Sequence, residues 1–466
     1  MNMAPQSPHM LPTPERVLST LNQDGSRRWI DPRSSPGRFL NRRRGIGWAL
    51  IALFAALPLV QIGGKPALFL DLMNREFTFF GTTFFATETL LLALLVVGIF
   101  LGVFWITALL GRVWCGYACP QTVYLELVYR PLQRLVEGKH GREGAPAWRR
   151  VLRFVVYLAL SFVIANVFLA YFVGVERLSR WITTSPAQHP AAFAVVAVTT
   201  IAMFIDFAYV REQMCTLMCP YGRLQSVLQD EHSLVIGYDA TRGEPRGKLE
   251  SGATRTHGDC IDCKLCVQTC PTGIDIRGGL QMECVGCAQC IDACDAVMDK
   301  IERPRGLIRY ATQATLAGKP KRTLRPRVVL YPLLIAVVSS GLIAALAKRS
   351  ELAVEFLRTR GAQFTVLADQ SISTPATIRL ENRADAAVDI VLEPEAGVTL
   401  LGAATAQRIE ARGYIEVDAT LIIPRERFVN GRAIVCVRAR NGDRVVVDTE
   451  HTVLGPLFAG GVEKNP

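Results

Sequence analysis

Eight cysteines in the stretch 260–294 constrain this chain more than any other feature. They form two runs of equal spacing, Cys-x2-Cys-x2-Cys-x3-Cys: Cys260, Cys263, Cys266 and Cys270, then Cys284, Cys287, Cys290 and Cys294. This is the ligand pattern of two 4Fe–4S clusters, in which the fourth cysteine of each run ligates the cluster of the other run. The spacing predicts one cluster on Cys260, Cys263, Cys266 and Cys294, and a second on Cys284, Cys287, Cys290 and Cys270.

Structural zinc and disulfide bonds are the alternative explanations of these thiols. Zinc favours four-cysteine knuckles without the x3-Cys-Pro tail seen at Cys270-Pro271, and disulfides need an oxidising compartment. The spacing therefore favours iron–sulfur ligation. Asp295 follows Cys294 where a proline is usual, which predicts a more polar and open environment for the cluster of Cys294.

The rest of the chain is too apolar for an ordinary soluble enzyme, with 50% hydrophobic residues and a mean hydropathy of +0.24. Apolar runs at 45–63, 84–110, 151–173, 191–210 and 328–347 predict five transmembrane helices. Residues 1–44, rich in Pro, Ser and Arg, are expected to be a flexible tail. The first apolar run begins too late for a cleavable signal peptide, so we expect it to remain as a span.

The formal net charge of +11 collects in alternate loops. A nucleic-acid-binding protein would place such an excess on one face, so no nucleic-acid partner is expected. The alternation instead indicates topology, because loops rich in Lys and Arg stay in the cytoplasm. It predicts a cytoplasmic N-terminus, a cytoplasmic cysteine-rich loop at 211–327 and a C-terminus outside.

The predicted fold class is an α-helical membrane protein with two further domains. An α+β two-cluster ferredoxin domain, at about 250–310, is inserted in the loop 211–327. The span 328–347 then leads to residues 352–455, where short β-branched runs separated by Asn, Gly and Pro predict an all-β sandwich. Cys436, a lone thiol on one of these strands, is expected to be buried in the core.

A second pair of cysteine motifs closes two of the predicted spans. Both read Cys-x3-Cys-Pro: Cys115 and Cys119 before Pro120, then Cys215 and Cys219 before Pro220. Each proline is well placed to open a helix, so the region 45–210 is interpreted as two copies of a two-helix unit. The four thiols predict one four-thiolate site or two two-thiolate sites for a soft metal such as Cu(I). The alternative is helix-end packing.

Further candidate ligands lie close by, namely Met214, Met218 and the intramembrane carboxylate Asp206. Carboxylates within spans are functional candidates, whereas Glu88 is interpreted as interfacial. The six histidines all fall outside the predicted spans, which argues against a membrane haem with two axial histidines.

Several further stretches carry a resemblance to a known family. They are Gly37-Arg38-Phe39, Gly111 to Pro120, Arg211 to Tyr221, Tyr238 to Gly247 and Arg325 to Val328. Together with both ferredoxin runs they make the chain resemble, over nearly its whole length, the cytochrome c oxidase accessory protein family CcoG/FixG/RdxA. Cys294-Asp295 is also similar to this family.

The resemblance implies a membrane-anchored iron–sulfur electron-transfer protein that reduces Cu(II) to Cu(I) for maturation of cbb3-type cytochrome c oxidase. By position, Cys115, Cys119, Cys215 and Cys219 match the family's membrane cysteines and would form the copper and redox site. It implies a bacterial inner-membrane location with a periplasmic Ig-like domain at 352–455. Partners would be the oxidase or its copper chaperones and an unknown cytoplasmic electron donor; a homodimer is also considered.

Two other functions stay open. One is a quinol-linked electron-transfer subunit of a respiratory system, as in periplasmic nitrate reduction systems with similar Cys-x3-Cys-Pro helices. The other is a non-enzymatic scaffold for oxidase assembly, or a redox sensor.

Overall fold

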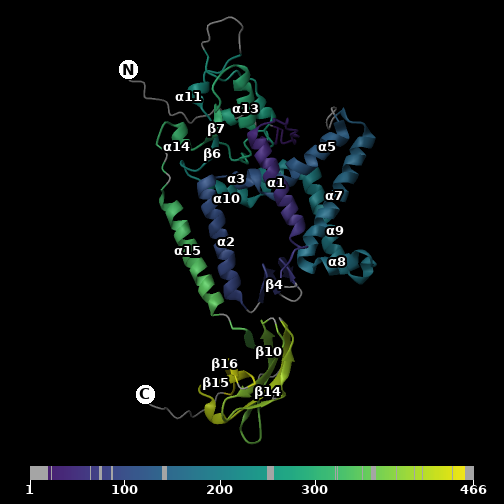
Figure 1. The fold of residues 1–466 in the computed structure, drawn as a ribbon, viewed down its shortest axis with the longest axis vertical. Helices are drawn as coiled ribbons and strands as arrows, with labels where there is room; N and C mark the ends of the chain where they lie inside the picture. The colour runs from purple at the N-terminus through teal and green to yellow at the C-terminus, as the bar shows by residue number, and fades with distance from the viewer. Residues whose placement is uncertain are drawn as a thin grey trace. The chain divides into compact units, whose positions relative to one another are not determined.

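The long apolar runs form helices in the computed structural model, and the C-terminal β-branched runs form strands (Figure 1). The structure describes residues 19–22, 24–62, 65–72, 76–85, 88–138, 144–248, 257–320, 322, 324–348, 350–357, 364–384, 386–403, 405–411, 413–442 and 444–456. Two units divide the chain, Met1–Leu342 and Ile343–Pro466. The first holds twelve of the thirteen cysteines and the second holds Cys436.

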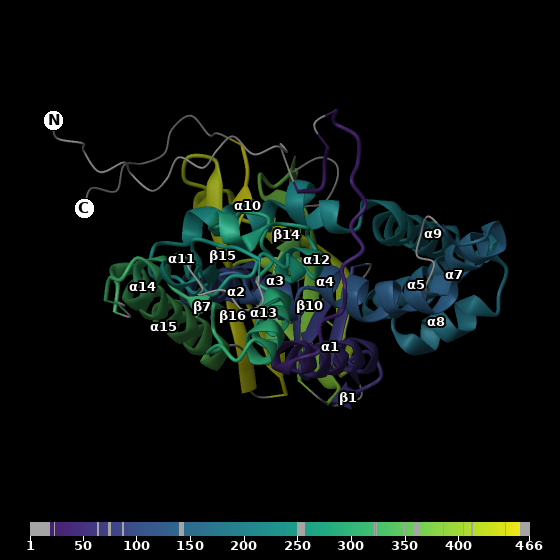
Figure 2. The same cartoon turned by 90° about the horizontal axis from the view of Figure 1, so that it is seen from above.

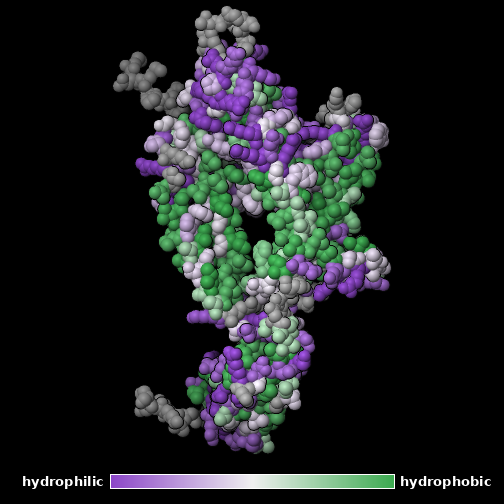
Figure 3. All heavy atoms as spheres, viewed as in Figure 1, coloured by the Kyte–Doolittle hydropathy of each residue, from purple (hydrophilic) through white to green (hydrophobic). Residues whose placement is uncertain are grey.

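Four helices in the described ranges are long and apolar enough to cross a membrane. They are α2 (Thr89–Leu110), α7 (Ala147–Val173), α9 (Pro190–Ile205, continued by the π-helix η4 at Asp206–Val210) and α15 (Pro326–Ala347). Most of their side chains are not buried inside the protein, and Figure 3 shows a broad hydrophobic surface over them. Such a surface is compatible with lipid rather than water.

The first predicted span forms a different kind of helix. α1 (Arg38–Ala56) begins among the arginines of the predicted tail and ends before the apolar run does. It does not meet the length and composition that the other four helices meet, so the five-span count is not confirmed. Its N-terminus is fixed to the ferredoxin region, where Asp292 accepts hydrogen bonds from the backbone N–H groups of Phe39 (3.2 Å) and Leu40 (2.8 Å).

Short strands connect α1 to α2. β1 (Gln61–Ile62) pairs with β2 (Lys65–Pro66), and β3 (Leu68–Asp71), β4 (Glu76–Phe79) and β5 (Thr82–Phe85) form an antiparallel sheet. Glu88 follows as the buried residue before α2.

Each Cys-x3-Cys-Pro motif ends in a helix that begins at its proline, as predicted. Pro120 opens α4 (Pro120–Tyr124) and Pro220 opens α10 (Pro220–Leu228), with Cys119 and Cys219 as the preceding cap residues. The first cysteine of each motif lies on α3 (Val113–Tyr117) or on the π-helix η5 (Met214–Met218). After α4 the chain continues through η1 (Leu125–Tyr129) and α5 (Arg130–Glu137). Figure 2 shows α5, α7, α8 (Val175–Ile182) and α9 grouped together.

The ferredoxin region is closed by a two-stranded antiparallel sheet of β6 (Val235–Tyr238) and β7 (Ile308–Ala311). Between these strands lie α11 (Ala240–Gly243), α12 (Leu265–Gln268), the 3-10 helix η6 (Ile276–Gly278) and α13 (Gln289–Lys300), and α14 (Gln313–Leu316) follows β7. The core consists of Ile236, Ile274, Ile291, Met298 and Leu307 around buried cysteines. The start of the predicted ferredoxin domain, residues 250–256, lies outside the described residues.

The second half of the predicted tail differs from the flexible segment expected there, whereas residues 1–18 lie outside the described residues. The backbone N–H of Arg33 donates to the carbonyl of Gln268 (2.8 Å), and the Thr269 hydroxyl donates to the carbonyl of Arg33 (2.7 Å). Ile30 is buried against Gly273. The segment therefore packs along the ferredoxin region before α1 begins.

The second unit is all-β, as predicted, and contains two sheets. One has the order β12 (Thr399–Leu401), β14 (Tyr414–Ile423), β10 (Ile372–Asn382), β8 (Leu352–Leu357), with β9 (Thr365–Val366) also paired to β10. The other has the order β13 (Gln407–Ile409), β11 (Val388–Pro394), β15 (Arg432–Asn441), β16 (Arg444–Leu454). Inward-facing apolar side chains of both sheets form one core.

The prediction that Cys436 is a core residue is wrong. Ala433, Val435, Val437 and Ala439 are the buried positions of β15. Side chains alternate between the two faces of a strand, so Cys436 lies on the outward face. It is half-buried there, with Glu450 opposite it on β16.

A buried ion network joins the N-terminal segment to the two motif regions. The Glu212 carboxylate contacts Arg130 (3.0 Å) and Arg27 (3.1 Å), and the side chains of Glu212 and Arg130 are each 1% exposed. Removing one partner of a buried pair leaves an uncompensated charge, which costs more than the pair contributes.

We expect Glu212→Gln to lower the free energy of unfolding of the first unit by about 3–5 kcal/mol, because Arg27, Arg130 and Arg211 share this carboxylate as a counter-charge. Arg130 would keep its second buried partner, Glu126. Thermal unfolding of the detergent-solubilised chain measures this as a lower melting temperature. Asp299→Asn is the matched control, since the Asp299–Arg305 pair is solvent-exposed and should contribute little. Equal melting temperatures for the Glu212 variant and the wild type would contradict the expectation.

Candidate functional site

The structure gathers the eight ferredoxin-type cysteines into two neighbouring groups. Cys270, Cys284, Cys287 and Cys290 line one small cavity, which Cys266 also lines, and we call these four the inner group. Cys294 lies in the electrostatic field of Cys260, Cys263 and Cys266, and we call these four the outer group. The fourth cysteine of each run thus lies near cysteines of the other run, and the assignment of ligands to two clusters stays a prediction.

Burial and neighbouring thiols raise the thiol pKa values within both groups. The pKa rises to about 11 for Cys284 and Cys287, and to about 12 for Cys266 and Cys294, with burial as the larger cause in each case. Thiols packed this closely favour their protonated form until a cation is bound among them.

Residues between the cysteines adopt left-handed backbone conformations. Asp262 (φ 51°) and Lys264 (φ 56°) turn the outer loop, while Gly286 (φ 69°) and Ala288 (φ 62°) turn the inner loop. Such conformations cost about 1–3 kcal/mol each for residues other than glycine and persist where the surroundings impose them. They allow cysteines three residues apart to turn toward a common centre.

Arg43 of α1 tests whether an anionic cofactor fits the inner group. Its side chain is fully buried, and none of its three guanidinium nitrogens has a hydrogen-bond partner in the described part of the chain. Glu126, already bound by Arg130, approaches only to 4.0 Å, whereas Cys287 acts on Arg43 electrostatically. An uncompensated buried cation is costly, so a cluster with negatively charged thiolate ligands fits this site.

A second group of four thiols lies at the ends of the apolar helices, and we call Cys115, Cys119, Cys215 and Cys219 the membrane-edge thiols. Burial and the Cys119 thiol raise the pKa of Cys115 to about 12, and burial, Cys119 and Cys115 raise the pKa of Cys215 to about 12. The four thiols are therefore neighbours. Among the described residues, no three His, Cys, Asp or Glu side chains are placed to hold a single metal ion.

Polar groups surround the membrane-edge thiols. The Cys115 thiol donates to the side-chain oxygen of Gln225 (3.3 Å), and Gln225 is itself buried with its Nε2 lacking a partner among the described residues. Burial raises the pKa of Cys119, although backbone N–H groups of Thr122 and Gln121 at the start of α4 oppose that rise. Hydrogen bonds of this kind favour a thiolate, and hence binding of a cation.

The other candidate ligands are not gathered with these thiols in the same way. Met218 is exposed and Met214 is half-buried on η5. Asp206 accepts a hydrogen bond from the side-chain amide of Gln121 (3.1 Å) and lines an apolar cavity. Glu88 lies at the opposite end of α2 from Cys115.

Backbone contacts join the membrane-edge motif to the inner group. A Cβ added at Gly116 would lie 2.7 Å from the carbonyl oxygen of Gly286 and 2.9 Å from the Cα of Cys287. The close approach requires glycine at position 116. The turn that carries Cys115 therefore touches the loop that carries Cys287.

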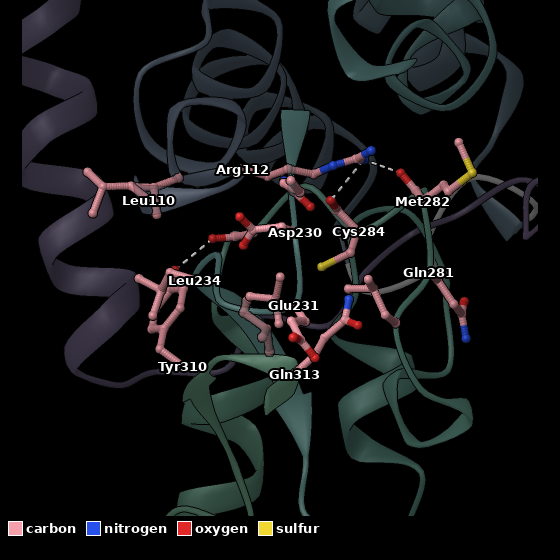
Figure 4. Close-up of a pocket in the computed structure, with 16 residues that line it drawn as sticks. Leu110, Arg112, Asp230, Glu231, Leu234, Gln281, Met282, Cys284, Tyr310 and Gln313 are labelled. Atoms are coloured by element: carbon pink, nitrogen blue, oxygen red, sulfur yellow. Dashed lines mark hydrogen bonds between the residues drawn. The ribbon is translucent and has the colours of Figure 1, made fainter. Parts of the chain in front are cut away.

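Arg112 supports the same junction from the other side. Its guanidinium donates to the carbonyl oxygens of Met282 and Cys284, and also to that of Gly222 (2.7 Å), which follows Cys219. Figure 4 shows Arg112 reaching toward Met282 and Cys284 at a cavity of about 310 Å³. This cavity, lined by both polar and apolar side chains, gives solvent or a small molecule access to the Cys284 loop.

Comparisons with known proteins identify three domains in this chain. Residues 210–313 match the 4Fe-4S dicluster domain, residues 92–139 match a 4Fe-4S binding domain, and residues 342–456 match the IG-like fold at the C-terminal of FixG. The protein RdxA of Cereibacter sphaeroides is 36% identical, with 76% of this chain and 79% of RdxA covered. The nitrogen fixation protein FixG of Rhizobium meliloti is 32% identical, with 86% of each chain covered.

The chain belongs to the FixG/RdxA family. The protein RdxB of C. sphaeroides is a further relative, 35% identical over 77% of this chain and 80% of its own. The family assignment and the matched domains make this an iron–sulfur electron-transfer protein of the FixG type with membrane helices. The match at 92–139 contains Cys115 and Cys119, so one of the two membrane-edge motifs also belongs to an iron–sulfur domain family.

Sequence reasoning missed Arg43, Arg112, Gly116 and Gln225 as site residues. Arg43 stands in a run of three arginines at the end of the predicted tail, and nothing local separates it from Arg42 and Arg44. The sequence does mark Gly116, because a glycine between two candidate ligands is where another backbone can approach closely.

We expect Gly116→Val to separate the membrane-edge motif from the inner loop, because both atoms that its Cβ would meet are backbone atoms. The purified variant should lose iron and sulfide from the inner group and show a lower melting temperature. Gly102→Val on α2 is the matched control, since a Cβ there meets nothing within 4 Å. Wild-type iron content in the Gly116 variant would contradict the proposed tightness of this junction.

Proposed function

We propose that this protein is a membrane-anchored cupric reductase that converts Cu(II) to Cu(I) at the membrane-edge thiols, for maturation of a cbb3-type cytochrome c oxidase. The observation that carries the proposal is the contact of Gly116 with Gly286 and Cys287, which brings four soft-metal ligands against the inner group. When bound, 4Fe–4S clusters supply one-electron transfer, and Cu(II) needs one electron to become Cu(I).

The thiols suit Cu(I) as substrate and product ligand. Thiolates prefer Cu(I) to harder ions, so the site would stabilise the reduced product. Cys115 and Cys215, whose pKa values are about 12, would release their protons when the metal binds. The side-chain oxygen of Gln225 accepts a hydrogen bond from the Cys115 thiol and so positions that thiol before the metal binds.

The positive-inside pattern supports the remaining parts of the proposal. It favours a cytoplasmic N-terminus and ferredoxin region, with the C-terminal unit on the other side of the membrane. The bacterial relatives support an inner-membrane location, with that unit in the periplasm. A cytoplasmic protein would supply electrons, and the β unit would contact the oxidase or a copper carrier. Met214, next to Cys215, is a soft ligand through which Cu(I) could leave.

The test uses the full chain, purified anaerobically in detergent and reduced before Cu(II) is added. We expect cluster absorption to reappear as one Cu(I) forms per electron lost, trapped by a colorimetric Cu(I) chelator. Cys115→Ser and Cys215→Ser should abolish Cu(I) formation while retaining the iron of both ferredoxin groups. Cys436→Ser is the matched thiol control and should behave as wild type.

Two results would reject the cupric reductase function. One is a reduced chain that does not transfer electrons to Cu(II). The other is loss of iron from Cys115→Ser and Cys215→Ser without loss of copper binding, which would assign these thiols to an iron–sulfur centre, as the domain match at 92–139 allows.

A quinol-linked function is the second candidate, and one cavity favours it. The cavity, about 460 Å³, lies between α1, α4, α7 and α9 and is mostly apolar. Asp206 and Gln121 supply a hydrogen-bonded carboxylate–amide pair within it, and Ala118 and Pro120, on either side of Cys119, line it. A lipid-soluble quinol needs such a pocket: apolar for its tail, with a base for the proton of its hydroxyl group.

Quinol oxidation releases two electrons and two protons, and Asp206 would take one proton while the other reaches solvent. The electrons would be accepted one at a time by the iron–sulfur centres. We expect a short-chain quinol to reduce the anaerobic full chain, and Asp206→Asn to slow this by about a hundredfold. Glu88→Gln, at the far end of α2, should have no effect. A chain that quinol does not reduce, or an Asp206 variant with wild-type rate, would reject this candidate.

A further inference from the structure

The two cysteine groups differ in the charges that face them. Arg43 and Gln289, the residue before Cys290, line one small cavity, and Cys287 acts on Arg43 electrostatically. Arg43 is buried there and lacks a hydrogen-bond partner among the described residues. Arg112 adds a second positive charge near Cys284, where Glu283 adds a negative one. Asp292, on α13 between Cys290 and Cys294, is already bound by the N-terminus of α1.

The outer group faces an arginine whose charge is neutralised. Arg277 acts on Cys266, but its guanidinium contacts both Asp262 and Asp275, the latter at 2.7 Å. Asp295, next to Cys294, adds a negative charge, and its partner Arg38 is exposed and lies 3.6 Å away. Lys264 and Arg246 also act on these aspartates, but like Arg38 they are exposed, where solvent screens their charge. The side chains that are buried or half-buried at the outer group, Arg277 with Asp262, Asp275 and Asp295, carry a net negative charge.

Reduction adds one negative charge to an iron–sulfur centre. Positive neighbours stabilise the reduced form and raise the reduction potential, and negative neighbours lower it. An interior charge acts strongly because the surroundings screen it weakly. Burial by itself disfavours the more highly charged form, so the buried inner group needs a fixed positive charge to remain a good electron acceptor.

We propose that Arg43 raises the reduction potential of the centre held by Cys270, Cys284, Cys287 and Cys290 above that of the centre held by Cys260, Cys263, Cys266 and Cys294. Arg43 does not contact a substrate; its positive charge would act on the cluster of the inner group. With both clusters bound, an electron would therefore be more stable at the inner group, whose Gly286–Cys287 peptide adjoins Gly116, than at the outer group. This direction rests on the proposed electron-transfer function, but the charge effect does not depend on copper.

The test is a redox titration of the anaerobic full chain, monitored by electron paramagnetic resonance without copper. Cys263→Ser, which alters the one exposed thiol among the described cysteines, identifies the signal of the outer centre. In the wild type, the inner centre should be reduced first. In Arg43→Gln, its reduced-to-oxidised ratio at a given potential should fall at least tenfold, which corresponds to about 59 mV for one electron.

Three controls separate charge from structure. Arg43→Lys keeps the charge and should keep most of the potential. Arg44→Gln changes the exposed neighbour on the same helix and should change nothing. Glu126→Gln removes the carboxylate nearest to Arg43 and should move the inner potential upward, so the proposal stays testable even where Arg43→Gln does not fold.

Two results of the redox titration would contradict the proposed effect of Arg43. A small cavity lined by Arg43, Glu126 and Gln289 has room for water that would screen the guanidinium. In that case Arg43→Gln and Glu126→Gln would both leave the inner potential unchanged, and the proposal would be wrong. Equal shifts of both centres in Arg43→Gln would also overturn it, because they would indicate a global structural change. Failure of copper reduction with these potential shifts intact would reject the cupric function alone.

Discussion

The backbone contact between Gly116 and the Gly286–Cys287 peptide is the constraint on which the site depends. The two main chains meet directly there, with no room for a Cβ atom at position 116. The contact requires glycine at position 116 and a left-handed residue at Gly286. Tyr310 fixes the same peptide, since its hydroxyl donates to the Gly286 carbonyl at 2.8 Å. A loop held this tightly can keep its thiols at a constant distance from the membrane-edge motif.

Buried ion pairs fix the neighbouring helices and loops relative to that contact. Glu212 lies three residues before Cys215, and Arg130 lies on the helix that continues from Pro120, so their ion pair links the two motif copies. Arg130 also donates to the carbonyl of Pro271, which follows Cys270 (3.3 Å). The ferredoxin region is therefore attached to the membrane region at both Arg112 and Arg130. Fixed attachment is what electron transfer between neighbouring centres needs, because it avoids reorganisation at each transfer.

Local spacing and periodicity predict the helix-opening prolines, four of the long apolar helices and the all-β C-terminal unit, and the structure contains all of them. The grouping of the cysteines into two ligand sets follows from spacing too and stays a prediction. What the sequence could not predict depends on tertiary context. Arg43 is identical in local signal to Arg42 and Arg44, and only the packing of α1 against α13 buries it. Hydropathy predicts a span at 45–63 because these residues are apolar. The helix that forms there instead begins at Arg38 and includes the arginines that precede the apolar run. The sequence does not show which face of the strand Cys436 occupies, because apolar residues lie on both faces. Ile434 points outward and is exposed, whereas Val435 points inward and is buried.

The membrane-edge thiols lie between two different environments, and this placement limits how electrons can reach them. On one side is the inner group, in contact through Gly116; on the other is the apolar cavity that ends at Ala118, Pro120 and the Asp206–Gln121 pair. A hydrophilic donor in solution meets the outer group first, since Cys263 is the exposed thiol, whereas a lipid-soluble donor meets Asp206 first. The charge asymmetry around the two groups favours the first route, because Arg43 attracts the electron inward from the outer group. A lipid-soluble donor would instead need the inner centre as its first acceptor, and the same arginine would then hold the electron next to the thiols. In both routes the proposed role of Arg43 is the same: its fixed charge would stabilise a reduced cluster at the inner group, adjacent to the membrane-edge thiols.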